Sequence, residues 1–222
     1  MSNQSLIVAE DVHRTYELGK KSIEVLRGID LVIDQGERVF LCGASGAGKT
    51  TLMYTLAGLE RPQMGRVSIE GEDLYKLSTK ERSRLRNRRM GYIFQSYYLL
   101  PELTALENVM VPGMIGSREV EDRGAELLEA VGLGDRGNHL PAELSGGEQQ
   151  RVAIARSLVN DPAIVFADEP TGNLDSKNGE EVMGFLLDFA ENMKTTLVVV
   201  THDLELAKCG DRILMIKDGV IL

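Results

Sequence analysis

A glycine-rich segment at residues 43–50 has the residue types and spacing of a loop that wraps the phosphates of a nucleotide. Glycine permits backbone conformations that a Cβ would obstruct, so successive N–H groups can converge on one phosphate. Lys49 is placed to reach the β and γ oxygens, and the Thr50 hydroxyl is a ligand for Mg²⁺. The competing interpretation is a turn that only connects a strand to a helix. The predicted phosphate-binding residues are Gly43, Ala44, Ser45, Gly46, Ala47, Gly48, Lys49, Thr50 and Thr51.

Two carboxylates close the apolar run Ile164–Ala167. A fully buried parallel strand presents such acids at its carboxyl end, where doubly wound sheets bind ligands. Asp168 is therefore predicted to belong to the Mg²⁺ shell, and Glu169 to accept a proton from an attacking water. Acids that follow a strand are also common on protein surfaces, and this is the alternative for the pair.

Two further polar residues follow predicted buried strands. Gln95 comes after Gly91–Phe94, and its carboxamide can bond both a metal-bound water and a mobile loop. His202 comes after Thr195–Thr201, where a contact with a γ-phosphate competes with a structural role. The predicted catalytic residues are Lys49, Gln95, Glu169 and His202, and the predicted metal-site residues are Thr50, Gln95 and Asp168.

A second helix start with glycines follows Leu144. Ser145 and Glu148 form a capping box, which explains both residues as structural. It does not explain Gly146 and Gly147, because each glycine in a helix costs about 1 kcal/mol relative to alanine. A bare helix start with free N–H groups and a serine hydroxyl is an anion site. The sequence therefore predicts two phosphate-binding ends where one nucleotide needs only one.

Two other features have both a functional and a structural interpretation. The ring of Tyr16 can stack on adenine, although its spacing alone favours partly buried packing. The helix predicted after Ser78 is strongly basic, which favours a solvated face over a surface for anionic lipid headgroups or nucleic acid. Its basic residues are Lys80, Arg82, Arg84, Arg86, Arg88 and Arg89.

The elements that must position these residues alternate between strands and helices. A buried strand at 38–42 enters the glycine-rich loop and a helix at 51–57 leaves it, with its positive end toward the phosphates. Strands at 6–12 and 25–33 add an antiparallel layer. The pattern is helical from 96 to 160, including an amphipathic run after Ser117. The predicted fold class is α/β, with a mostly parallel core sheet, an antiparallel β layer and an inserted helical subdomain.

The composition is that of a soluble globular protein, with 222 residues of which 43% are hydrophobic. No run of about 18 apolar residues and no secretory signal is visible. Two cysteines, Cys42 and Cys209, indicate a reducing compartment without a disulfide framework. The net charge of −9 argues weakly against a nucleic-acid partner. It does not argue against a nucleotide, because distant charges are screened over about 8 Å whereas Lys49 acts in contact.

With these residues placed, the chain resembles the ATP-binding-cassette ATPases over essentially its full length. The resemblance implies a P-loop NTPase fold, ATP and Mg²⁺ as cofactors, and Tyr16 as the residue that stacks on adenine. It also implies one domain over 1–222, with a RecA-like core at 1–95 and 161–222 and a helical subdomain at 96–160. The similar motifs are Walker A at Gly43–Thr50, the Q-loop at Gln95, the signature at Leu144–Gln149, Walker B at Ile164–Asp168 with the catalytic Glu169, the D-loop at Asn173–Asp175 and the switch histidine at His202.

The resemblance further implies partners. Ser145 and Gly147 of one subunit would close on ATP held by Gly43–Thr51 of a second subunit, which accounts for the surplus anion site. ATP would close this head-to-tail homodimer and hydrolysis assisted by Glu169 would reopen it. The implied location is the cytoplasmic face of the inner membrane, on an integral membrane permease encoded as separate chains, with no nucleic acid.

Within the family, the segments 97–109, 148–151 and 172–175 most resemble the lipoprotein-releasing, macrolide-export and cell-division cassettes. Leu103–Val109 most resembles the lipoprotein-releasing ATPases of LolD type, which implies ATP hydrolysis coupled to lipoprotein release. Macrolide or peptide export and a cell-division role are the alternatives. A soluble cassette that acts on DNA or ribosomes fits poorly, because only one set of motifs is present. Intact Glu169 and His202 disfavour a regulator that does not hydrolyse ATP.

Overall fold

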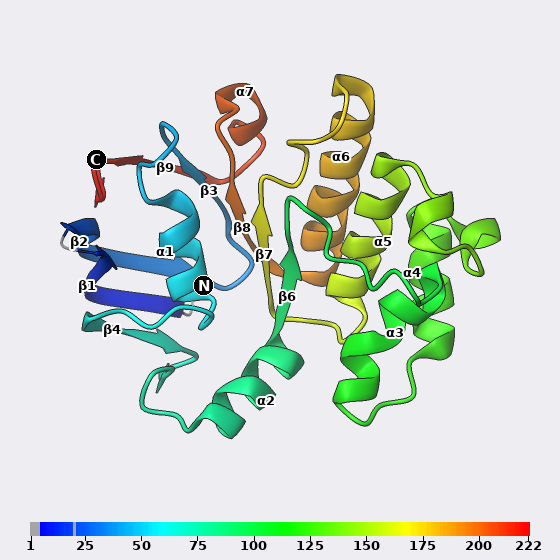
Figure 1. Cartoon of the computed structure of the whole chain (residues 1–222), viewed down its shortest axis with the longest axis horizontal. Helices are drawn as coiled ribbons and strands as arrows, with labels where there is room; N and C mark the ends of the chain where they lie inside the picture. The colour runs from blue at the N-terminus through cyan, green and yellow to red at the C-terminus, as the bar shows by residue number, and fades with distance from the viewer. Residues whose placement is uncertain (1–4, 20) are drawn as a thin grey trace. The chain divides into compact units, whose positions relative to one another are not determined.

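The computed structural model describes residues 5–19 and 21–222, which divide into two compact units (Figure 1). The first unit comprises the chain up to Ser83 together with Thr196–Leu222, and the second comprises Arg84–Thr195. The boundary falls within helix α2 (Thr79–Arg89), none of whose residues is buried. Among the described residues, none of the helices combines the length and the apolar character needed to cross a bilayer.

The first unit contains an antiparallel sheet in the order β2-β1-β4-β5. Its strands are β1 (Ser5–Leu18), β2 (Lys21–Asp34), β4 (Met64–Ile69) and β5 (Glu72–Asp73). The hairpin of β1 and β2 extends well beyond the predicted strands at 6–12 and 25–33, because backbone pairing continues to the tip of the hairpin. Side chains at 21–24 are exposed and those at 13–16 are half-buried, so no apolar alternation marks this part in the sequence.

The first unit also contains a parallel set of strands, in which β3 (Arg38–Cys42) lies between β8 (Thr196–Val200) and β9 (Arg212–Lys217). The last strand, β10 (Val220–Ile221), pairs antiparallel with β9. Side chains of β3 and β8 are buried almost completely, as expected for parallel strands covered on both faces. Helix α1 (Lys49–Leu56) follows β3, and helix α7 (Leu204–Ala207) follows β8.

The second unit joins a parallel strand pair to a group of helices. The strands are β6 (Met90–Ile93) and β7 (Ile164–Asp168). Helix α5 packs on α3, α4, α6 and β6, and its side chains Val152, Ile154 and Leu158 are fully buried. The helices are α3 (Ala105–Ile115), α4 (Glu121–Ala130), α5 (Gly146–Leu158) and α6 (Ser176–Met193), with 3₁₀ turns at Gly134–Arg136 and Pro141–Glu143.

The amphipathic run after Ser117 becomes helical only at Glu121, later than the pattern predicts. Ser117 itself has a φ of 56° and ends the turn that leaves α3. Val120 then packs on Gly113, where a Cβ would lie only 2.2 Å from Val120 Cγ2. This close contact orients the chain before α4 begins.

The start of α3 is joined to the preceding loop by a buried asparagine. Asn108 is fully buried, and its Nδ2 donates to the carbonyls of Leu100, Leu103 and Thr104, each at 3.0 Å. Its Oδ1 accepts from the backbone N–H of Leu100 at 2.7 Å. One side chain thus satisfies a loop that otherwise has few partners of its own.

Candidate nucleotide-binding site

The glycine-rich loop connects β3 to α1 in a conformation that only glycine adopts readily. Gly43 and Gly48 have φ values of 150° and 104°. A Cβ at Gly43 would lie 2.2 Å from the Ile216 carbonyl oxygen, and one at Gly48 would lie 2.8 Å from that of Val25. Both positions therefore require glycine for backbone conformation and for space.

Lys49 is folded back over the loop. Its side chain is 8% exposed, and Nζ donates to the carbonyls of Gly43 at 2.9 Å and Ala44 at 3.1 Å. Gly48, the residue before α1, makes no side-chain cap, and no acid occupies the first turn of the helix. The N-terminal N–H groups of α1 and the ammonium together form a site suited to an anion.

Tyr16 is held by its own set of contacts in the first unit. Its hydroxyl donates to Glu60 Oε2 at 2.5 Å, and Arg14 donates to Glu60 Oε1 at 2.7 Å. The Arg14 guanidinium also lies 4.6 Å from the centre of the Tyr16 ring. Burial, and then the hydrogen bond to Glu60, raise the pKa of Tyr16. The ring is therefore fixed in orientation on the side of Arg14.

His202 lies at the same sheet edge as the glycine-rich loop. Strands β3 and β8 are parallel with Leu41 opposite Val200, so Gly43 and His202 each stand two residues beyond that pair. The N–H of Thr201 donates to the Leu41 carbonyl at 3.2 Å, which fixes the chain just before the histidine. The histidine is exposed and precedes the cap of α7.

The second unit brings the predicted glutamine and carboxylates together. Strands β6 and β7 are parallel with Ile93 opposite Ala167, so Gln95 and Glu169 each follow two residues later. A Cβ at Gly172 would lie 3.2 Å from Gln95 Nε2 and 3.4 Å from Glu169 Cβ, so both side chains border this glycine. Asp168, the last residue of β7, is 8% exposed, whereas Glu169 follows it with a φ of 46°.

The turn after Glu169 is fixed by side chains from two directions. Asn173 Nδ2 donates to the Gln95 carbonyl at 2.8 Å. Gln150 Nε2, from the buried face of α5, donates to the Pro170 carbonyl at 2.6 Å. Helix α5 is therefore joined by a direct hydrogen bond to the segment that carries the candidate catalytic carboxylate.

The predicted second anion site is a capped helix start. Ser145 Oγ donates to Glu148 Oε2 at 2.7 Å, and the Ser145 N–H donates to the same oxygen at 2.8 Å. Ser145 Oγ in turn accepts from the Glu148 N–H at 3.3 Å. The hydrogen bond from the serine side chain is the main cause of the lowered pKa of Glu148. A Cβ at Gly146 would lie 3.3 Å from Tyr97 Oη, whereas Gly147 is less crowded.

A half-buried arginine that no sequence motif indicates holds the segment after Gln95. Tyr97 and Tyr98 have φ values of 61° and 47°, which is unusual for bulky residues. Arg156 of α5 donates to their carbonyls at 2.5 and 2.6 Å. Burial lowers the pKa of Arg156 to about 10. No pattern in the sequence indicates this contact, or the contact of Glu60 with Tyr16, because the residues in each pair are far apart along the chain.

The predicted residues thus fall into two groups, each described within its own unit. The first unit carries Tyr16, the loop Gly43–Thr51 and His202, and the second carries Gln95, Ser145–Glu148, Asp168 and Glu169. Within each unit, parallel strands place some of these residues at one edge of a sheet, namely Gly43 and His202 in the first unit and Gln95 and Glu169 in the second, which is where such sheets bind ligands.

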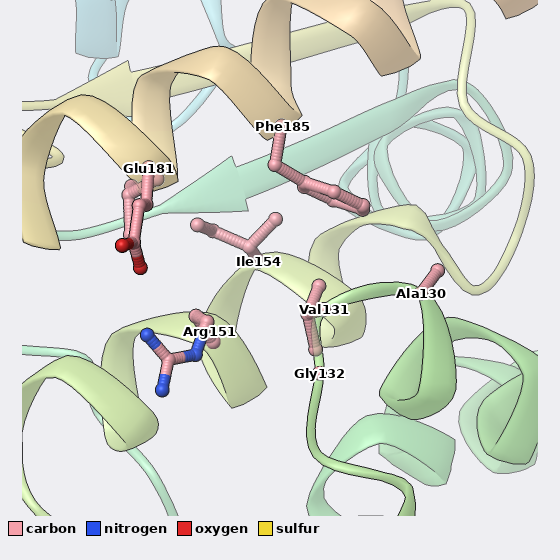
Figure 2. Close-up of a pocket in the computed structure, with 8 residues that line it drawn as sticks. Ala130, Val131, Gly132, Arg151, Ile154, Glu181 and Phe185 are labelled. Carbon is pink, nitrogen blue, oxygen red and sulfur yellow. The ribbon is translucent and has the colours of Figure 1, made fainter.

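The second unit also has a pocket of about 290 Å³ between α5, α6 and the turn after α4 (Figure 2). The polar groups of Arg151 and Glu181 lie on one side of it and the Phe185 ring on the other. Arg151 Nε is buried without a hydrogen-bond partner. None of the lining residues is a predicted ligand of the nucleotide.

Comparison with known proteins agrees with this geometry. The sequence profile of the family described as "ABC transporter" matches residues 26–172. The lipoprotein-releasing system ATP-binding protein LolD of Pseudomonas fluorescens is 48% identical over 99% of this chain and 98% of the relative. That of Cytophaga hutchinsonii is 49% identical over 99% of this chain and 100% of the relative. The macrolide export ATP-binding/permease protein MacB of Syntrophobacter fumaroxidans is 46% identical over 97% of this chain, which covers 31% of that protein.

A solved structure shows the same fold. The dimeric ATP-binding cassette MJ0796, in a post-hydrolysis state with ADP and Pi, superposes with a TM-score of 0.91. It is 40% identical in sequence, and the match covers 97% of this chain and 96% of that one. The α/β fold with parallel and antiparallel strands is thereby confirmed.

Proposed function

Because the chain belongs to the ABC transporter family as one of its ATP-binding, ATP-hydrolysing members, we propose that it powers the release of lipoproteins from a membrane. The observation that carries this proposal is the match to LolD proteins of distant bacteria at 48% and 49% identity over nearly the whole chain. Export of macrolides is the second candidate, favoured by the MacB relative at 46% identity. In both cases ATP hydrolysis would drive a partner embedded in the membrane.

The residues of the first unit would bind the triphosphate. The N–H groups of the glycine-rich loop and Lys49 Nζ would exchange their present contacts for phosphate oxygens. Tyr16 would stack on adenine with the ring face that Arg14 does not cover. His202 would contact the γ-phosphate from the adjacent end of β8.

The residues present fit Mg²⁺ as the metal cofactor. The Thr50 hydroxyl and the Asp168 carboxylate are hard oxygen donors, and Gln95 can hold a metal-bound water. Among the described residues, no group of three or more acidic, histidine or cysteine side chains forms a closed metal site. The proposed ion would be held by one carboxylate together with phosphate oxygens. Bound there, Mg²⁺ would neutralise charge on the phosphates, while Glu169 accepts the proton of the attacking water.

The start of α5 would serve the nucleotide of a second copy. Its serine and glycines are not needed by a nucleotide that already has the loop before α1. We infer an ATP-dependent homodimer, in which Ser145 and Gly147 close on the ATP of the partner. The dimeric state of MJ0796 supports this inference.

The partner in the membrane would dock on the segment from Gln95 to Val109, and the chain would then lie on the cytoplasmic face of the inner membrane. Glu102 is exposed there, whereas Glu107 is engaged in the capping box of α3. Glu102→Lys is therefore the cleaner test. It should uncouple transport in proteoliposomes while nucleotide binding is retained. Normal transport in this variant would exclude docking at Glu102.

The decisive experiment on the activity is Glu169→Gln. This variant should bind Mg-ATP, hydrolyse it about 100-fold or more slowly, and accumulate as a dimer. Light scattering after size exclusion would measure the mass, and phosphate release the rate. Glu180→Gln, an exposed position on α6, is the matched control and should behave as the wild type. A Glu169→Gln variant that stays monomeric with saturating Mg-ATP, or turns over normally, would overturn the proposal.

A further inference from the structure

Helix α2 concentrates positive charge on a chain whose net charge is −9. The only acid within α2 is Glu81. Its carboxylate accepts from Ser78 Oγ at 2.6 Å and from the Ser78 N–H at 2.9 Å, so the helix cap already uses it. The six basic side chains are Lys80, Arg82, Arg84, Arg86, Arg88 and Arg89.

Three of these cations share one exposed face. Lys80, Arg84 and Arg88 are four residues apart along α2, and all three are exposed. Like charges at this spacing destabilise a helix by a few tenths of a kcal/mol per pair. In the part of the chain that the structure describes, no carboxylate lies within ion-pair distance of Arg84 or Arg88. The face therefore lacks an internal partner that would explain its charge.

Two exposed apolar side chains lie at the end of α3, which contacts the end of α2 within the second unit. Asn87 Nδ2 donates to the Pro112 carbonyl at 2.8 Å, which joins the end of α2 to the end of α3. There Met114 is 62% exposed and Ile115 is 73% exposed. A Cβ at the following Gly116 would lie 2.7 Å from Asn87 Oδ1, so the two helix ends are in close contact.

We propose that this α2–α3 patch, defined as Arg84, Arg88, Met114 and Ile115, binds the anionic lipid surface of a membrane. Guanidinium groups form paired hydrogen bonds with phosphate, and exposed apolar side chains beside them enter the boundary between headgroups and acyl chains. A nucleic acid would use the charge but not the two apolar residues. A second copy of the same patch would be repelled by its own cations.

Acidic residues limit the patch on one side. Glu119, Glu121 and Asp122 are exposed at the start of α4, which Val120 joins to Gly113 of α3. A phosphate surface repels these carboxylates, so the contact is confined to the α2 side of the α3 end. The helix would then approach the membrane by its exposed face rather than by its ends.

Vesicle flotation with the full chain tests the proposal. The wild type should bind vesicles of phosphatidylglycerol and phosphatidylcholine and not vesicles of phosphatidylcholine alone. Binding should weaken steeply as salt is raised from about 0.1 M to about 0.5 M, because the Debye length falls below about 5 Å. Arg84→Gln/Arg88→Gln should lower the partition coefficient on the order of 30-fold, since each basic residue near such a surface contributes about a tenfold or smaller factor.

Two further variants locate the contact. Met114→Ser/Ile115→Ser should weaken binding while its salt dependence stays unchanged. Lys208→Gln/Lys217→Gln removes the same charge from exposed positions in the first unit and should bind as the wild type. Equal binding to neutral vesicles, or equal losses in the two charge variants, would overturn the proposal. So would binding of the patch to duplex DNA in place of vesicles.

ATP binding measured in the same samples separates this inference from the proposed function. Arg84→Gln/Arg88→Gln should bind Mg-ATP as the wild type does, because neither arginine is a candidate ligand of the nucleotide. Loss of ATP binding in this variant would indicate misfolding. In that case the variant Arg84→Lys/Arg88→Lys, which keeps the charge, should be tested, and it should still bind vesicles. If it has wild-type stability but does not bind vesicles, a charge-based contact is excluded.

Discussion

The N-termini of two helices in this molecule, α1 and α5, contain glycine and are predicted to bind phosphate, but the two differ in side-chain capping. At α1, Gly48 provides no side-chain cap, and Lys49 lies back over the loop. At α5, Ser145 and Glu148 form a complete capping box. The first start is thus left open for a ligand, whereas a ligand at the second must take the serine hydroxyl from its present partner.

The difference explains how one sequence can hold its own nucleotide and still recognise that of a second copy. An open helix start binds an anion without first losing an internal hydrogen bond. A capped start is stable alone and gains little until a partner presents its phosphates.

The largest effect is expected for Lys49→Ala. Loss of two charge-assisted contacts to phosphate should weaken ATP binding by the single chain about 100-fold. Isothermal titration measures it, with Lys208→Ala as the control at an exposed position. Unchanged affinity would mean that the open start of α1 is not the primary site.

Ser145→Ala should separate the two starts. ATP binding by the single chain should stay unchanged, while hydrolysis falls about tenfold, because one contact across the dimer is lost. Loss of the cap should also lower the free energy of unfolding by about 1 kcal/mol, or the melting temperature by about 2–4 °C. Ser145→Thr keeps the hydroxyl and should restore both quantities. If Ser145→Ala binds ATP about tenfold more weakly as a single chain, the proposed difference between the two helix starts would be wrong.

A smaller effect is expected for Glu60→Gln, which weakens the contacts that orient Tyr16. The KM for ATP should rise about threefold with kcat unchanged, since an aromatic stack contributes about 0.5–1.5 kcal/mol. Glu72→Gln, at an exposed position of β5, is the matched control. A fall in kcat without a change in KM would assign Glu60 a different role.

The smallest effect concerns pH and the cap of α5. The pKa of Glu148 is lowered in the folded state, mainly by the hydrogen bond from Ser145. Its contribution to stability is therefore complete above the unfolded value of about 4.3 and is lost as pH falls through the folded pKa. The difference in unfolding free energy between wild type and Glu148→Gln should be constant near neutral pH and shrink in acid. A difference that grows in acid would contradict the cap.

Much of the fold follows from local sequence patterns. The strand at Arg38–Cys42, the helix after Ser78 and the cap at Ser145 agree with the structure. These elements have strong local signals, namely a short apolar run or a serine or threonine followed three residues later by glutamate. The tip of the first hairpin has no such signal, because its backbone pairing continues where the apolar residues no longer alternate with polar ones.

The contacts that hold the residues of the candidate site in place could not be predicted from the sequence. Gln150, Arg156 and Glu60 act on backbone or side chains 20, 59 and 44 residues away, respectively. Such pairs have no fixed spacing, so no pattern in a single sequence predicts them. The roles assigned to the motif residues themselves remain predictions for the experiments above.

The loop between Gln95 and α3 is anchored at both ends, by Arg156 at Tyr97 and Tyr98 and by Asn108 from Leu100 to Thr104. A segment held at both ends by hydrogen bonds has little freedom to change its conformation when one end moves. The segment should therefore move as a rigid unit. A shift of a fraction of an ångström at Gln95 on nucleotide binding would be transmitted almost completely to the first turn of α3.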